Sequence, residues 1–107
     1  MKELIDSVLS EIDIDFYYLK RPQNVFPCIV YYYNETTNSL GDNKEESSKY
    51  NIYINLFIKS DISNNINKVK KKLEEYGFIK KVINSPIQFD GLDYYQVTFN
   101  YTKIIAA

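Results

Sequence analysis

The sequence predicts an α+β fold in which a mostly antiparallel sheet of about four to five strands carries two helices on one face. Two observations lead to this fold class. Residues 4–12 and 62–76 place apolar side chains at helical spacing, whereas several other segments alternate apolar and polar residues as strands do. The 107 residues leave room for a single domain, residues 1–107, with one hydrophobic core.

The first helix is predicted from apolar residues that recur on one helical face. These are Leu4, Ile5, Val8, Leu9 and Ile12. A short strand-like segment follows at residues 16–19 and breaks at Arg21-Pro22. Pro27 then opens the next strand, where no ladder hydrogen bond is needed from its nitrogen.

Two strands are predicted at residues 28–33 and 50–58. The first is apolar or aromatic on both faces, so both faces could be covered. The second has one continuous apolar side, formed by Tyr50, Ile52, Ile54, Leu56 and Ile58. Between them, residues 34–49 read "NETTNSLGDNKEESSK", with Leu40 as the one apolar residue, and this segment is predicted to be a long polar loop.

The second helix has signals at both ends. Ser60 or Asp61 can cap its start, and Gly77 stands where a left-handed C-terminal cap is usual. Its buried stripe keeps a spacing of four and three residues: Ile62, Ile66, Val69, Leu73 and Tyr76. Strand segments follow at residues 78–83 and 86–89, then a hairpin turn at Asp90-Gly91 and a final alternating strand over residues 94–102.

The sequence offers little for catalysis, so no enzyme activity, metal or cofactor is expected. It has no histidine, and Cys28, its one cysteine, stands at the head of an apolar strand. The paired carboxylates have no catalytic neighbours and are typical of turns and solvated surface. These pairs are Asp13 with Asp15, Glu45 with Glu46, and Asp90 with Asp93.

Charge and hydropathy indicate the compartment and exclude some partners. The net charge is −1, and the lysines at 68, 70, 71 and 72 are followed at once by Glu74 and Glu75, so no specific nucleic acid is expected. Residues 1–50 carry nine acidic and five basic side chains, and residues 51–107 carry five and eight, a split that could favour head-to-tail self-association. No signal peptide or membrane span is apparent, and a single cysteine fits a reducing compartment.

The order of segments resembles the tail terminator, or tail completion, proteins of long-tailed phages and prophages. The matching pieces are "FPCIVYYY" before the polar segment, "YNIYINLFIKSD" running from strand into helix cap, "VKKKLEEYGF" ending at glycine, and "DYYQVTFNY" as the last strand. Together they span residues 26–101.

This resemblance implies a structural role without catalysis. The protein would close the tail tube as a hexameric ring, contacting the tail tube protein on one side and a head-completion or connector protein on the other. It would act in the cytoplasm of the bacterial host during assembly and then in the virion tail. The resemblance also suggests that residues 34–49 are mobile in the free subunit and become ordered against a neighbouring subunit or tube protein. The alternative is a surface insertion without a role.

Aromatic residues on the strands indicate where a contact could form, because aromatic side chains are enriched at interfaces. The candidate interface residues are Tyr31, Tyr33, Leu40, Tyr53 and Phe57. The other interpretation of the aromatic faces is that they pack under a helix.

Two other functions remain open from the sequence. One is another connector component of the head-to-tail joint, which would share the small α+β shape and ring assembly. The other is a small metal-dependent nuclease that uses Asp90, Asp93 and a lysine, although the two aspartates straddle a predicted turn.

Overall fold

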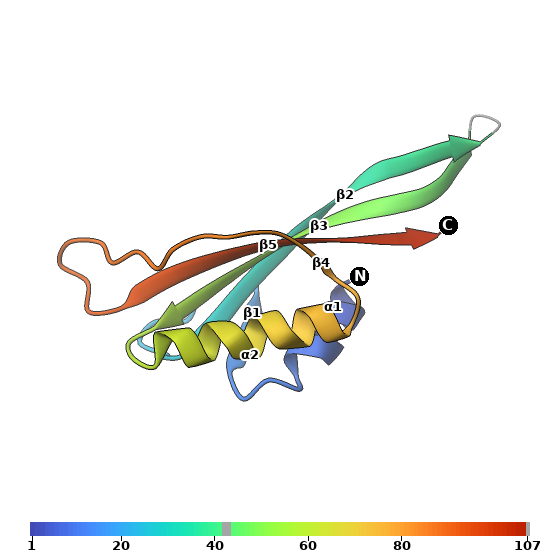
Figure 1. The fold of residues 1–107 in the computed structure, drawn as a ribbon. Coiled ribbons are helices and arrows are strands. Elements are labelled where there is room, and N and C mark those ends of the chain that lie inside the picture. Colours follow the sequence, from blue (N-terminus) through green and yellow to red (C-terminus); the bar gives the residue numbers. More distant parts are fainter. Residues whose placement is uncertain (42–43, 107) are drawn as a thin grey trace.

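The computed structural model describes residues 1–41 and 44–106, and within them a five-stranded sheet is covered by two helices on one face (Figure 1). The predicted α+β fold class is therefore confirmed. In chain order the elements are α1 (Lys2–Leu9), β1 (Asp15–Tyr18), β2 (Cys28–Gly41), β3 (Lys44–Ile58), α2 (Ile62–Glu75), β4 (Ile79–Ile83) and β5 (Tyr95–Ala106).

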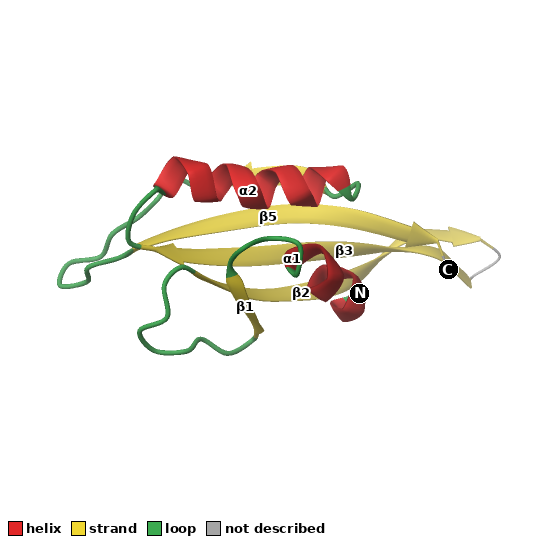
Figure 2. Ribbon diagram, turned by 90° about the horizontal axis from the view of Figure 1, so that it is seen from below, coloured by secondary structure: helices red, strands yellow, loops and turns green. Residues whose placement is uncertain are grey.

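The strands lie in the order β1-β2-β3-β5-β4. The β2–β3, β3–β5 and β5–β4 pairs are antiparallel, and the short edge strand β1 runs parallel to β2. Seen from the helix side, α1 and α2 lie next to each other across this sheet (Figure 2). In the described ranges, both helices lie on one face of the sheet and the opposite face carries none (Figure 2).

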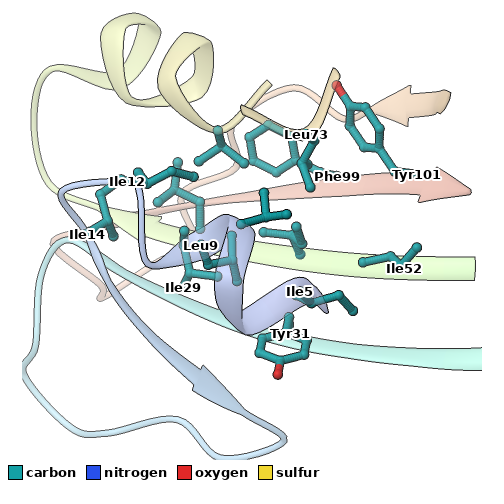
Figure 3. Packing of buried hydrophobic residues seen from close by; sticks show 14 of the residues in the cluster. Ile5, Leu9, Ile12, Ile14, Ile29, Tyr31, Ile52, Leu73, Phe99 and Tyr101 are labelled. Atoms are coloured by element: carbon teal, nitrogen blue, oxygen red, sulfur yellow. The ribbon is translucent and has the colours of Figure 1, made fainter. Parts of the chain in front are cut away.

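The hydrophobic core lies between the helices and the sheet (Figure 3). Ile5 and Leu9 of α1 and Leu73 of α2 are fully buried against the central strands. The apolar side predicted for residues 50–58 faces these helices, since Ile52, Ile54, Leu56 and Ile58 are all fully buried. Burial of each such side chain contributes about 1.5 to 3 kcal/mol, so these contacts fix which face the helices cover.

Helix α2 begins and ends where its sequence signals predict. Asp61 occupies the predicted N-cap position, but its side chain makes no capping hydrogen bond there. At the other end Gly77 has a left-handed φ of 81°, and the Phe78 amide donates to the Leu73 carbonyl at 3.0 Å. This hydrogen-bond pattern is a Schellman motif, which turns the chain sharply into β4.

The predicted long loop at residues 34–49 is wrong. Residues 34–41 extend β2 and residues 44–49 begin β3, and the two segments pair as an antiparallel hairpin, here called the hairpin arm. Register shifts interrupt the pairing near Ser39. Residues 34–37 are exposed, and the sequence of residues 34–49 shows no apolar alternation, so the pattern that reveals other strands is absent here.

The hairpin arm makes the molecule elongated. The principal extents are 54 × 26 × 22 Å and the radius of gyration is 15.1 Å, against about 13 Å for a compact domain of this length. β5 accompanies β3 as far as the pair Ser47 and Ala106. The arm therefore continues the sheet beyond the helices instead of folding back on the core (Figure 1).

The C-terminal hairpin is less regular than predicted. Asp90 and Gly91 form the expected turn, and Gly91 has a φ of 82°. However, residues 86–89 form no strand: Ile87 makes a single bridge to Gln96. The backbone N–H of Asn84 also donates to the Thr98 carbonyl at 2.9 Å. This loop therefore follows the edge of β5 without a complete ladder of backbone hydrogen bonds.

Candidate interaction surface

The sheet face away from the helices is the strongest candidate for a functional surface. Register places its side chains in rows across the three central strands: Cys28, Phe57 and Gln96; Val30, Asn55 and Thr98; Tyr32, Tyr53 and Asn100; Asn34, Asn51 and Thr102; and Thr36, Lys49 and Ile104. We call this set the open sheet face.

The open sheet face is nearly free of charge. Among its residues only Lys49, in the row nearest the end of the arm, carries a formal charge at neutral pH. Charged residues make up 25% of the chain, so their scarcity on this face is a local feature. Depletion of charge is what distinguishes the centre of a protein interface from ordinary surface.

Aromatic and apolar side chains are exposed on this face and beside it. Tyr32 and Tyr53 stack across strands with ring centroids 4.9 Å apart, and Tyr32 remains 43% exposed. Toward β4, Ile79 and Val82 pair with Thr102 and Asn100 and are 59% and 46% exposed. Such an apolar group beside an uncharged face is typical of surfaces that bind another protein.

The polar side chains of the open sheet face largely bond to one another and to the backbone. The Asn55 side-chain oxygen accepts hydrogen bonds from Thr98 at 2.9 Å and Gln96 at 3.2 Å. The Asn51 amide donates to Asn34 at 2.8 Å. A partner that covered these groups would displace little water from unpaired donors and acceptors, which lowers the desolvation cost of binding.

Arg21 packs against aromatic rings at one end of this face. The Arg21 guanidinium carbon lies 4.1 Å from the Phe57 ring centroid and 4.5 Å from that of Tyr94. Arg21 also donates a hydrogen bond to the Tyr94 hydroxyl at 2.9 Å. These cation–π contacts hold the loop before β2 and the loop before β5 against the end of the sheet.

The predicted interface residues separate into different environments. Tyr53 lies on the open sheet face, whereas Phe57 is covered by Arg21 and is only 8% exposed. Tyr31 and Tyr33 pair with Ile54 and Ile52 and therefore face the helices.

Tyr31 is fully buried, so its prediction as an interface residue is wrong and the second interpretation, packing under a helix, holds for it. Tyr33 packs against the edge of the core. The side chain of Leu40 lies outside the described part of the chain.

Tyr31 takes part in a polar contact beneath α1. Its hydroxyl donates to the Asp6 carboxylate, which also pairs with Lys2 at 2.8 Å. Burial raises the pKa of Tyr31 above its ordinary value, and the hydrogen bond to Asp6 adds to this. Burial alone would raise the pKa of Asp6, but the hydrogen bonds from Lys2 and Tyr31 outweigh it and leave that pKa lowered.

The residues considered for catalysis do not assemble into a site. Asp93 pairs with Lys59 at 3.1 Å, and Asp90 is an exposed turn residue. Burial raises the pKa of the Cys28 thiol, which disfavours the reactive thiolate. Within residues 1–41 and 44–106, no three His, Cys, Asp or Glu side chains lie together as metal ligands would.

The lysines of α2 are mixed with acidic side chains. Lys72 contacts Glu75 at 3.1 Å and Glu11 at 3.5 Å, and the hydrogen bond to Glu75 raises the pKa of Lys72. Glu11, Asp13 and Glu75 line the same shallow depression as Lys68 and Lys71. A phosphate backbone would meet both signs of charge here, which weakens any case for electrostatic binding.

No family model matches this chain, and no curated protein matches it significantly. In the described part of the chain, neither helix has the length and apolar character that a membrane crossing requires.

The sequence contained a signal for the open sheet face that the predictions did not use. Asn51, Asn55, Gln96, Thr98 and Asn100 alternate with core residues on two predicted strands. A solvated strand face usually includes Lys, Glu or Thr, whereas here every polar position of the central rows is uncharged. The cluster around Arg21 had no such signal, because Arg21, Phe57 and Tyr94 are far apart in the chain.

Proposed function

We propose that this protein is a structural virion protein of the tail terminator kind, which closes the tail tube as a homo-oligomeric ring. The single observation that carries the proposal is the open sheet face, which is uncharged except for Lys49, partly aromatic and already hydrogen-bonded within itself. This is the character of a surface that holds a protein partner. The resemblance of residues 26–101 to tail terminators supports the choice of partner.

In this function the open sheet face contacts the tail tube protein, and a head-completion or connector protein binds on the other side of the ring. The ring is a hexamer, and it assembles in the cytoplasm of the bacterial host before it becomes part of the virion tail. No catalytic step is required, and the elongated hairpin arm supplies reach along the tube.

A charge placed on the open sheet face tests the proposal. Tyr53→Asp puts a carboxylate next to Tyr32, where a bound partner would bury it without a counter-charge. We expect at least a tenfold loss in binding to purified tail tube protein, measured by co-sedimentation and by electron microscopy of capped tube ends. The matched control is Asn67→Asp on the exposed side of α2, which should bind like the wild type.

Two results would overturn the proposal. Equal binding by Tyr53→Asp and the control would show that the open sheet face is not the contact. Absence of wild-type binding to tube protein, together with binding to a portal or adaptor protein, would assign the chain to another connector component. Circular dichroism of each variant shows whether the fold is kept.

A further inference from the structure

Among the described residues, unpaired strand edges lie on both sides of the sheet, and two of them belong to β2 and β4. β1 covers β2 only over Cys28–Tyr31, so residues 33–37 of β2 have an open outer edge; we call this segment the β2 edge. On the other side β4 is the last strand of the sheet. In the described part of the chain, no strand pairs with either edge.

The β2 edge presents hydrogen-bonding groups to the outside. The Tyr31 carbonyl accepts a hydrogen bond from the Leu19 amide at 3.1 Å, on the side away from β3. Because N–H and C=O groups of alternate residues point to the same side of a strand, Tyr33, Glu35 and Thr37 direct theirs outward as well. Such a row is a template for another strand.

Strand directions favour pairing of the β2 edge with β4 of a second copy. Passing from β2 through β3 and β5 to β4 reverses direction three times, so β4 runs opposite to β2. A second copy placed beside the first, with its helices on the same side, therefore offers β4 as an antiparallel partner. Antiparallel pairing is slightly more stable per residue than parallel pairing.

β4 and the β2 edge also lie at similar levels along the strand direction, so that they can pair between copies. Through the registers of β3 and β5, Ile79 and Ile83 of β4 lie level with Asn34 and Tyr31 of β2. β4 is 5 residues long, and a shift of two residues, or roughly 7 Å, places it along the β2 edge with Lys80 level with Glu35. Neighbouring copies would thus sit at nearly the same height.

The charges of the two edges are complementary. Glu35 is exposed on the β2 edge, and exposed Glu3 of α1 lies near Tyr33. On the other side Lys80 and Lys81 are exposed on β4, and no acidic residue occurs between residues 76 and 88. Glu35 and Lys80 both point to the helix side of their sheet, since they pair with Tyr50 and Tyr101.

We propose that the β2 edge of one copy pairs antiparallel with β4 of a second copy, so that subunits join head to tail into one continuous sheet. The two edges differ, so the contact is heterologous and repeats around a ring if the rotation closes. As the subunit contact of a terminator ring, this inference rests on the proposed function.

Cysteine pairs test the contact directly. Glu35→Cys and Lys80→Cys are made as separate proteins with different tags, mixed and oxidised; the native Cys28 is buried. We expect the mixed disulfide dimer to exceed either like-with-like dimer at least fivefold. The variant with both cysteines should form a ladder of covalent oligomers. In the control pair, Glu35→Cys with Lys68→Cys of α2, the mixed disulfide dimer should not exceed the like-with-like dimers.

Charge reversal supplies a second measurement. Glu35→Lys and Lys80→Glu should each weaken self-association about two- to tenfold in sedimentation velocity, and the double variant should recover most of the loss. Lysines on an edge strand can also serve to block pairing. In that case Lys80→Glu would strengthen association or leave it unchanged, and this result would overturn the proposal.

The outcomes separate this inference from the proposed function. Covalent ladders from a protein that does not bind tube protein would support the edge contact and refute the terminator role. Tubes capped by the wild type, with no preferential disulfide between positions 35 and 80, would keep the terminator role and refute the edge contact.

Discussion

At the scale of single residues, the contact of Tyr31 with Asp6 joins α1 to the sheet. The hydroxyl of a fully buried side chain needs an acceptor, and the Asp6 carboxylate at the helix surface provides it. Lys2 compensates the charge of Asp6 from the same helix. The short helix α1 is thus tied to β2 by a polar contact as well as by Ile5, Val8 and Leu9.

A double-mutant cycle measures this contact. Asp6→Ala leaves the buried Tyr31 hydroxyl without its acceptor and should lower the free energy of unfolding by about 1 to 3 kcal/mol. In a Tyr31→Phe background the same substitution should cost much less, because no hydroxyl remains to be satisfied. Urea unfolding followed by circular dichroism gives the free energies of unfolding of the wild type, the two single variants and the double variant. Equal costs of Asp6→Ala in both backgrounds would contradict the coupling.

Asp6 should also make stability depend on pH. Its pKa is lowered in the folded state, so its stabilising contribution is complete above the ordinary pKa and is lost as the pH falls through the folded value. The stability difference between wild type and Asp6→Asn should therefore shrink between about pH 5 and pH 2. Urea unfolding across this range measures it, and a constant difference would rule out this role for Asp6.

At the scale of elements, the longest segments predicted correctly bury one face, whereas the short strand β4 was predicted although its residues are mostly exposed. Helix α2 and strands β3 and β5 lie between the core and water, so their apolar residues recur at the period of the element. Strand β2 is different, because its first residues are apolar on both faces. The sequence therefore did not show that Tyr31 faces the helices while Tyr32 faces outward, and register with β3 was needed to assign them.

The hairpin arm was missed for a related physical reason. Its strands pair with each other and with the continuation of β5, as in the pair Ser48 with Ile105, and none of its described side chains belongs to the buried cluster. Composition alone cannot separate such a solvated strand from a polar loop.

The arm should be dispensable for folding. Replacing residues 37–48 with Asn-Gly would close β2 and β3 with a favoured two-residue turn between Thr36 and Lys49, which already pair. None of the residues in the buried cluster is removed, so the free energy of unfolding should change by less than about 1 kcal/mol. Thermal and urea unfolding measure this, and a loss of several kcal/mol would show that the arm supports the core.

At the scale of the whole molecule, the fold separates stability from recognition. Both helices cover one face of the sheet, and the large fully buried side chains of the described residues lie on that face. The other face, the arm and the two strand edges contribute less to the core and are available for contacts. In the proposed ring the edges join subunits, whereas the open sheet face meets a different protein.

The scarcity of charge on the open sheet face gives these two kinds of contact different physical controls. In the proposed ring, contacts between Glu35 and Lys80 across an edge would be attractions between exposed ions, which dissolved salt weakens over a screening length of about 8 to 10 Å. Binding through Tyr32, Tyr53 and their amide neighbours involves no such ions and is strengthened, if anything, by salts that favour apolar burial. Raising the ionic strength would therefore weaken the association between subunits and leave the binding of each subunit to the protein on its open sheet face largely unchanged.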